Sequence, residues 1–347
     1  MTLRTGKLPQ AMLADLLARI PSHDPRVVVG PSVGRDAAVI DLGDRLLVVK
    51  TDPVTFAGDR IGWYAVNVNA NDVACMGARP AWFLATVLLP ADAPDDLPGR
   101  ILDDLLAACD ALDIALIGGH TEVTAGIDRP IVSGTMLGES SHEEIVTGDS
   151  VAPGDVILLT RGVAIEGTAL LAHESPDVLA AAGVEHGTVE RAAAMLFDPG
   201  ISVVADARVL CAATRPRLMH DPTEGGIATA LHEMAQAAGM TLVVDPASIP
   251  VLAETRFICE ALELDPLGLL ASGALLAIVA AADAASVVQA LSATGTACHA
   301  VGVVADGPAR VILGSEDRET PFPAFARDEL ARFYDRATSE TLDHRKD

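Results

Sequence analysis

The sequence has few aromatic residues and no long apolar run, and each shortage excludes a class of function. Aromatic residues make up 3% of the chain, so we do not expect the stacking platforms that bind single-stranded nucleic acid. No apolar stretch approaches the ~20 residues that span a bilayer, and Met1 to Thr5 show no apolar signal-peptide region. We therefore expect a soluble, cytoplasmic protein that binds neither nucleic acid nor a membrane.

Cysteine is also scarce. The five cysteines are odd in number and form no C-x-x-C pair, which argues against a disulfide framework or a thiolate zinc site. We expect most of them to be small buried apolar residues. They are Cys75, Cys109, Cys211, Cys259 and Cys298.

Positive charge is limited as well. The formal net charge of −24 would repel a nucleic-acid backbone or an anionic membrane surface. A phosphate-binding site in such a chain needs local cations or a metal ion. The only lysines are Lys7, Lys50 and Lys346. Lys50 is the better candidate for a phosphate contact because it lies near Asp52 at a strand end, whereas Lys7 is equally well explained by a composition that favours arginine.

The 347 residues, half of them hydrophobic, are enough for two cores. Strand-like runs alternate with helical patterns along the chain, which predicts an α/β or α+β class. Pro153-Gly154-Asp155 is a strong turn signal. We place the domain boundary there, with domains at 1–150 and 151–347.

Acidic turns at the ends of apolar runs are the main functional signal. Asp36 and Asp52 each follow or precede a strand, and Asp72 lies on a helix of small residues. Carboxylate oxygens are the ligands that Mg²⁺ takes in nucleotide sites. Each aspartate alone could be an ordinary turn or capping residue. The prediction of a metal site depends on their occurring together.

Three further features have a functional interpretation, and the last two also have a structural one. Gly118-Gly119 is interpreted as a turn that follows a strand, where backbone N–H groups can approach an anion. His220 to Gly226 leads into a helix and could bind an anion at the helix N-terminus, or could simply cap it. Asn71 shares a helix face with Asn67 and could serve a ligand or a hydrogen bond between helices.

Several well-known signatures are absent. The chain has no G-x-x-x-x-G-K-[ST] loop, no G-x-G-x-x-G and no G-x-S-x-G elbow. His232-Glu233 begins like a zinc-protease motif, but residue 236 is Gln236 rather than the second histidine. Phosphate binding must therefore use another geometry.

These motifs, in this order, resemble the PurM or AIR synthase-related superfamily, which includes aminoimidazole ribonucleotide synthetase, thiamine-monophosphate kinase, selenophosphate synthetase and HypE. The likeness is closest to HypE-like hydrogenase expression/formation proteins and covers nearly the whole chain. The matching segments are Gly34 to Ile40, Lys50 to Asp52, Asn71 to Ala78, Gly118 to Glu122 and Asp221 to Gly226.

The resemblance implies a two-domain PurM-like fold and a homodimer whose N-terminal sheets pair into a shared β-barrel, with ATP bound between the subunits. It implies Mg²⁺ ligands at Asp36, Asp52 and Asp72, and catalytic roles for Asp221 and His120. Several relatives have a carboxylate at the position of His120, so a phosphate contact is expected there instead. The implied nucleotide-binding residues are Lys50, Asn71, Gly118, Gly119, Thr121 and Glu122.

The family cleaves ATP and transfers or attaches phosphate to an oxygen, so we expect an ATP- and Mg²⁺-dependent enzyme acting on a small or amide-type acceptor. HypE itself works on its own C-terminal cysteine. The last cysteine here is Cys298, 49 residues before Asp347 (347 − 298). Hydrogenase maturation with a thiol from a partner is therefore one alternative, and a non-catalytic nucleotide-binding regulatory or scaffold protein is another.

Overall fold

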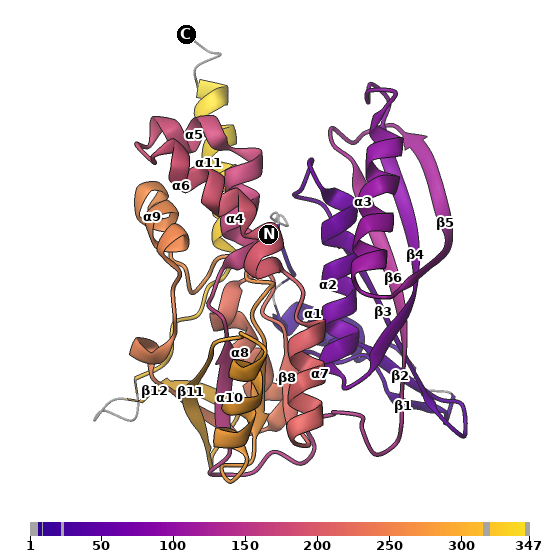
Figure 1. Cartoon of the computed structure of the whole chain (residues 1–347), viewed down its shortest axis with the longest axis vertical. Coiled ribbons are helices and arrows are strands. Elements are labelled where there is room, and N and C mark those ends of the chain that lie inside the picture. Colours follow the sequence, from indigo (N-terminus) through magenta and orange to yellow (C-terminus); the bar gives the residue numbers. More distant parts are fainter. Residues whose placement is uncertain (1–5, 9, 22–23, 315–319, 344–347) are drawn as a thin grey trace.

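The computed structural model describes residues 6–8, 10–21, 24–314 and 320–343. They form two six-stranded sheets in two domains, with an additional layer of helices above the second sheet (Figure 1). A short helix, α1 (Gln10–Leu17), precedes the first sheet. The boundary predicted at residue 150 falls in the segment that joins the last strand of the first sheet to the first strand of the second.

The first sheet has the strand order β1-β2-β3-β6-β4-β5. Its neighbours are antiparallel except for β4 and β5, which are parallel and joined through helix α3 (Leu97–Ala111). Helix α2 (Ile61–Cys75) packs against this sheet and against α3, which also contacts β5. The strands are β1 (Val27–Val29), β2 (Ala38–Asp41), β3 (Leu46–Val54), β4 (Arg79–Pro90), β5 (Ala115–Thr124) and β6 (Ile131–Ser140).

Small residues let α2 lie very close to its neighbours. A Cβ on Gly138 of β6 would overlap the Val73 side chain, and a Cβ on Gly62 would lie 2.6 Å from the Ile101 carbonyl oxygen. As a result α2 is buried on nearly all sides, including its polar residues Asn71 and Asp72. Buried polar groups need partners, and those partners define the site described below.

The second sheet has the order β12-β9-β11-β7-β10-β8 and is covered on both faces. Along β7 (Val156–Thr160), Ile157 and Leu159 pack on the side of helix α8 (Gly226–Ala238). Leu158 packs on the opposite side, in the cluster that includes residues of α7 (Val204–Ala213) and α10 (Ala284–Ala293). The other strands are β8 (Leu218–His220), β9 (Thr241–Val244), β10 (Leu276–Val279), β11 (Cys298–Ala305) and β12 (Arg310–Leu313).

The remaining helices form the upper layer in Figure 1. Residues of this layer share one apolar core with α2 and α3, so the two domains are packed directly against each other. Phe56, after β3, stacks on Tyr334 with ring centroids 6.0 Å apart. The helices are α4 (Ile165–Glu174), α5 (Pro176–Ala181), α6 (His186–Ala194), α9 (Ala253–Leu262) and α11 (Glu329–Asp343), with the short turn η1 (Leu196–Gly200). A second short turn, η2 (Pro246–Ser248), lies against β11 of the second sheet.

The predicted α/β class is confirmed, with one correction. Gly118-Gly119 does not form a turn but lies inside strand β5. Within the described residues the first sheet is open, and no closed barrel forms in the single chain. All five cysteines are free thiols. In the described part of the chain, no helix is both long and apolar enough to cross a bilayer.

Candidate active site

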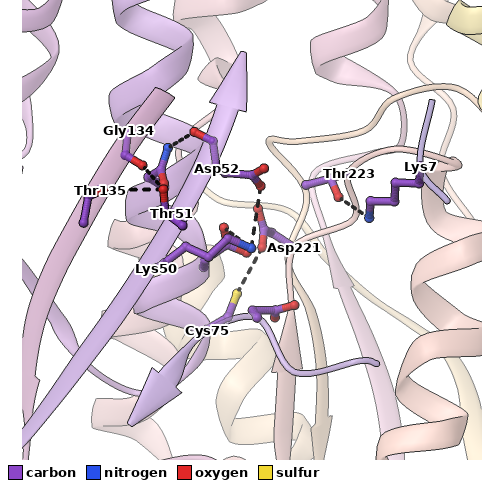
Figure 2. Close-up of polar contacts among 12 residues, drawn as sticks. Lys7, Lys50, Thr51, Asp52, Cys75, Gly134, Thr135, Asp221 and Thr223 are labelled. Atoms are coloured by element: carbon purple, nitrogen blue, oxygen red, sulfur yellow. Dashed lines mark hydrogen bonds and ion pairs between the residues drawn. The ribbon is translucent and has the colours of Figure 1, made fainter. Parts of the chain in front are cut away.

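Lys50 is the centre of a partly buried ionic cluster at the junction of β3 and α2. Its Nζ lies 3.1 Å from Asp72 Oδ2 and 3.6 Å from Asp52 Oδ2. Alternation along β3 places Lys50 and Asp52 on the same face, while Thr51 points away and donates to the Gly134 carbonyl oxygen at 2.7 Å (Figure 2). Two of the three predicted metal-binding aspartates therefore meet at the predicted phosphate-binding lysine.

The third aspartate, Asp36, belongs to a second group of ligand-type side chains. Its Oδ2 lies 3.0 Å from His220 Nδ1. One donor atom each from Asp36, His220 and Asp221 lie within 4.8 Å of one another. Asp221 also accepts a hydrogen bond from the Cys75 thiol at 3.8 Å (Figure 2). Residues from both domains thus converge here.

The two groups interact electrostatically. Burial raises the pKa of Asp72 to about 7, with Lys50 acting in the opposite direction and Asp36 and Asp52 adding to the rise. Burial also raises the pKa of Asp221 well above its usual value, and Asp72 and Asp36 raise it further. For Lys50, burial lowers the pKa, but Asp72, Asp52 and Asp36 together shift it upward. The site holds excess negative charge that a bound cation would offset.

A cavity of about 680 Å³ opens beside this cluster. Asp52, Lys7 and Thr223 line one part of it, and Lys7 Nζ donates to Thr223 Oγ1 at 3.2 Å. Its volume is in the range of small-molecule sites. Two buried polar atoms of its lining residues, Tyr64 Oη and Glu224 Oε2, have no hydrogen-bond partner among the described residues, and two further buried lining residues, Glu166 and Ser272, interact with each other. Such groups are rare in folded proteins and suit a polar ligand.

Asp221, predicted to be catalytic, is fully buried and is not among the residues that line this cavity. It accepts from the Cys75 thiol and lies near the Asp36–His220 pair, within 4.8 Å of one donor atom of each. Asp221 is therefore placed to act as a metal ligand or as a nearby negative charge. Its position does not support direct contact with an acceptor bound in the cavity.

Asn71, predicted to bind the nucleotide, holds the two domains together. Its Nδ2 donates to the Ile201 carbonyl oxygen at 2.9 Å, and its Oδ1 accepts from the Val203 amide at 2.8 Å. The structural alternative, a hydrogen bond between helical segments, therefore describes its contacts.

Backbone amides at the N-terminus of α8 already donate hydrogen bonds to groups of the protein itself. The Gly225 amide donates to Asp328 Oδ2 at 2.5 Å, and the Gly226 amide donates to the Thr223 carbonyl oxygen at 3.0 Å. An internal carboxylate thus occupies the position where an anion was expected.

The segment from Gly118 to Glu122 lies apart from the cluster in this chain. It belongs to β5, the exposed edge strand, and β6 and β4 separate β5 from β3. At about 4.8 Å per strand this is roughly 14 Å. His120 and Glu122 contact each other at 3.1 Å and are both exposed. The single chain therefore does not bring Gly118, Gly119, His120, Thr121 or Glu122 to the aspartates.

Glu166 was missed by sequence reasoning, His220 was named only as the start of a segment that could bind an anion or cap a helix, and Glu233 only as part of an incomplete zinc-protease motif. His220 directly precedes the predicted Asp221, which was the available signal. Its Nε2 lies 3.0 Å from Glu233 Oε2 on α8. Glu166 belongs to α4 and lines the cavity only because the two domains pack together.

Comparisons with known proteins agree with this architecture. Residues 34–140 match the N-terminal domain of the AIR synthase related protein family, and residues 152–314 match its C-terminal domain. The chain is 32% identical over 253 residues to carbamoyl dehydratase HypE of Cupriavidus necator, covering 71% of this chain and 68% of the relative. It is 31% identical to carbamoyl dehydratase HypE of Rhodobacter capsulatus, covering 74% of each chain.

Solved structures show the same fold. The crystal structure of E. coli HypE superposes with a TM-score of 0.71 at 21% identity, covering 93% of this chain and 98% of that one. A HypE structure in complex with ATP gives a TM-score of 0.68 at 22% identity, covering 92% and 91%. The sequence matches, together with this fold, show that the chain belongs to the AIR synthase related protein family and is HypE-like.

Proposed function

We propose that this chain is an ATP- and Mg²⁺-dependent enzyme of hydrogenase maturation that dehydrates a carbamoyl group carried on the thiol of a partner protein. The observation that carries the proposal is the Lys50–Asp52–Asp72 cluster at the edge of a cavity with unpartnered polar groups. The relatives named carbamoyl dehydratase favour this activity over a general small-molecule kinase.

The donor set fits Mg²⁺. Asp52 and Asp72 offer hard oxygen ligands at one point, and Asp36 adds to their negative field. When bound, Mg²⁺ would neutralise phosphate charge as ATP is cleaved. Lys50 would then turn from its two carboxylates toward the phosphates, because the cation replaces it as their counter-charge.

The reaction balances without an oxidant or reductant. The carbamoyl oxygen attacks the γ-phosphorus of ATP, and the bond to the ADP oxygen breaks. The carbamoyl nitrogen loses both protons, the C–O bond breaks, and the oxygen leaves as part of inorganic phosphate. A thiol-bound carbamoyl group thereby becomes a thiol-bound cyano group, with ADP, phosphate and a proton as the other products.

The cavity offers complementary groups for such an acceptor. Glu166 and Glu224 present carboxylate oxygens that can accept from the carbamoyl NH₂ group, and Tyr64 and Ser272 present hydroxyl donors for its oxygen. Burial of these side chains would keep water away from the phosphorylated oxygen.

We further propose a homodimer in which the N-terminal sheets pair into a shared barrel. The exposed edge of β5 supports this, since Ile117 and Val123 are 55% and 64% exposed there. Pairing would bring the Gly118–Glu122 segment of one copy toward Asp52 of the other. That arrangement would restore the predicted phosphate contacts of Gly118, Gly119 and Thr121, and the predicted roles of His120 and Glu122.

The test is product analysis with full-length protein, Mg²⁺, ATP and a peptide bearing S-carbamoyl cysteine. We expect ADP to form in step with loss of one water from the peptide mass. Phosphate retained on the acceptor, or turnover with thiamine monophosphate alone, would support a kinase instead. ATP binding without turnover in every mixture would support the regulatory or scaffold alternative.

A further inference from the structure

A second cavity, of about 590 Å³, lies between the two domains and shares no lining residue with the cavity beside Asp52. We call it the interdomain cavity. The C-terminal end of α2 and the neighbouring end of α3 contribute an apolar wall that includes Ala74, Ala78 and Leu112, and α7 forms the opposite wall. Figure 1 shows α2 and α7 side by side. A molecule bound here would contact both domains, and the volume is in the range of small-molecule sites.

One face of α7 is open to the interdomain cavity. Residues of α7 that line it recur at the i, i+3, i+4, i+7 and i+8 spacing of a single helical face, and Arg215 continues this spacing just beyond the helix. The series on α7 is Val204, Ala207, Arg208, Cys211 and Ala212. Burial, with a smaller contribution from the charge of Glu144, raises the pKa of the Cys211 thiol to about 11. The middle of this face is therefore poorly solvated.

Two of the carboxylates that line the cavity are paired within the chain. Glu139 lies 2.6 Å from Arg45, and Asp113 lies 2.6 Å from Arg79. These pairs leave little free negative charge at their positions. The cavity therefore does not have the character of a cation site.

The arginines of the α7 wall have no such partners. The side chains of Arg208 and Arg215 form no ion pair among the described residues, although the chain has 48 acidic residues against 24 basic ones. Arg215 also lines an adjoining cavity of about 420 Å³ together with Arg217, whose buried Nε has no hydrogen-bond partner among the described residues. Guanidinium groups bind carboxylate, sulfonate and phosphate oxygens in pairs. This end of the cavity therefore suits an anionic group.

The alternative is a gap that holds only water, with Arg208 and Arg215 offset at longer range by Glu143 and Glu144. Both glutamates line the cavity, but neither forms an ion pair with an arginine in the part of the chain that the structure describes. Ordered water needs several polar partners, and the apolar walls offer few. An amphipathic anion would cover those walls and pair with the arginines at once.

We propose that the interdomain cavity binds a small amphipathic anion, whose apolar body lies along α7 and whose carboxylate, sulfonate or phosphate group contacts Arg208 and Arg215. The apolar walls supply most of the buried surface, and the guanidinium groups fix the orientation of the ligand. The inference does not depend on the proposed function, because none of these residues belongs to the Lys50 cluster or lines the cavity at Asp52.

The test compares two fluorescent probes that share one aromatic body, with full-length protein, saturating Mg²⁺ and ATP. Anilinonaphthalenesulfonate carries an anionic group, and N-phenylnaphthylamine is the same molecule without it. We expect the sulfonate probe to bind one site per chain and at least about tenfold more tightly than the neutral probe, as a charge-assisted contact does. Equal affinities, or displacement of the sulfonate probe by ATP, would overturn the proposal.

Arg208→Gln and Arg215→Gln should each weaken binding of the sulfonate probe by about tenfold and leave the neutral probe unchanged. Ala212→Phe adds a ring at an exposed position of the cavity wall and should weaken both probes. Arg256→Gln is the matched control, because Arg256 is an exposed arginine on α9 whose side chain forms no ion pair among the described residues. Circular dichroism establishes that each variant is folded. Wild-type affinity for the sulfonate probe in a folded arginine variant of the cavity, or in folded Ala212→Phe, would show that the probe binds elsewhere and would refute the site.

Discussion

Lys50 Nζ lies 3.1 Å from Asp72 Oδ2, so a strand end and a buried helix contribute opposite charges to one point. Asp72 is only 6% exposed as a side chain. Taking one partner of a buried pair away leaves the other uncompensated. The contact therefore links β3 to α2 and places the carboxylates where a cation can bind.

Asp72→Asn should weaken Mg²⁺-dependent ATP binding while the fold is kept. Loss of one anionic oxygen ligand is expected to cost at least about tenfold in affinity, or about 1.4 kcal/mol. Isothermal titration calorimetry with and without Mg²⁺ measures this. Asp92→Asn, in the turn after β4, is the control. Wild-type affinity in both Asp72→Asn and Asp52→Asn would show that the cation lies elsewhere.

Asn71→Ala should destabilise the protein without changing ATP affinity. The change removes two buried hydrogen bonds and leaves the Ile201 carbonyl and the Val203 amide without their partner. A cost of about 2–5 kcal/mol in unfolding free energy follows. Denaturant unfolding measures it.

Asn67→Ala is the matched control for that experiment, because Asn67 donates only to the Trp63 carbonyl of its own helix at 2.8 Å. It should cost about 1 kcal/mol. A large loss of ATP affinity in folded Asn71→Ala would restore the predicted nucleotide contact.

The Lys50 cluster was predictable because its signals are local. Alternation along β3 gives Lys50 and Asp52 a common face, and the small-residue helix carries Asp72 behind them. The contact between Asp36 and His220 joins residues 184 positions apart (220 − 36), and no periodicity encodes it. It depends on how the two domains pack, as does the approach of Glu166 to the cavity.

Gly118-Gly119 was misread for a different physical reason. Paired glycines after a strand usually indicate a turn, but here they continue the strand past a register shift between β4 and β5. Their φ angles are +153° and +156°, a region that residues other than glycine rarely adopt. The glycines correctly indicated an unusual backbone conformation. The sequence did not show that this conformation occurs within a strand that pairs with β4.

Stability should depend on pH through Glu166. Burial raises the pKa of its carboxyl group to about 7, with Ser272 partly opposing the rise, whereas the unfolded value is about 4.3. The protonated form is thus favoured in the folded state. Its stabilising contribution is complete below about pH 4 and is lost as the pH rises to about 7.

Glu166→Gln removes this dependence, so its unfolding free energy relative to the wild type should increase across that interval by up to about 3 kcal/mol. Burial also raises the pKa of Asp328 to about 7, and its charge adds to the rise at Glu166, so part of the measured difference arises from the interaction of these two carboxyl groups. Thermal unfolding at a series of pH values measures it. A difference that stays constant from pH 4 to 8 would contradict the assignment.

Gly119→Ala should disrupt β5, and Gly118→Ala should be milder. Both positions have positive φ, but a Cβ at Gly119 would overlap the Ala85 carbonyl oxygen of β4, whereas a Cβ at Gly118 meets no atom within 4 Å. The pair therefore separates steric overlap from backbone strain.

If β5 forms the proposed dimer contact, Gly119→Ala should shift the protein toward monomer in light scattering and raise amide exchange along β5 and β4. Gly118→Ala should remain largely dimeric. A Gly119→Ala protein that stays dimeric while its β5 amides exchange rapidly would place the subunit contact on another surface, and with it the route by which His120 and Glu122 reach a nucleotide.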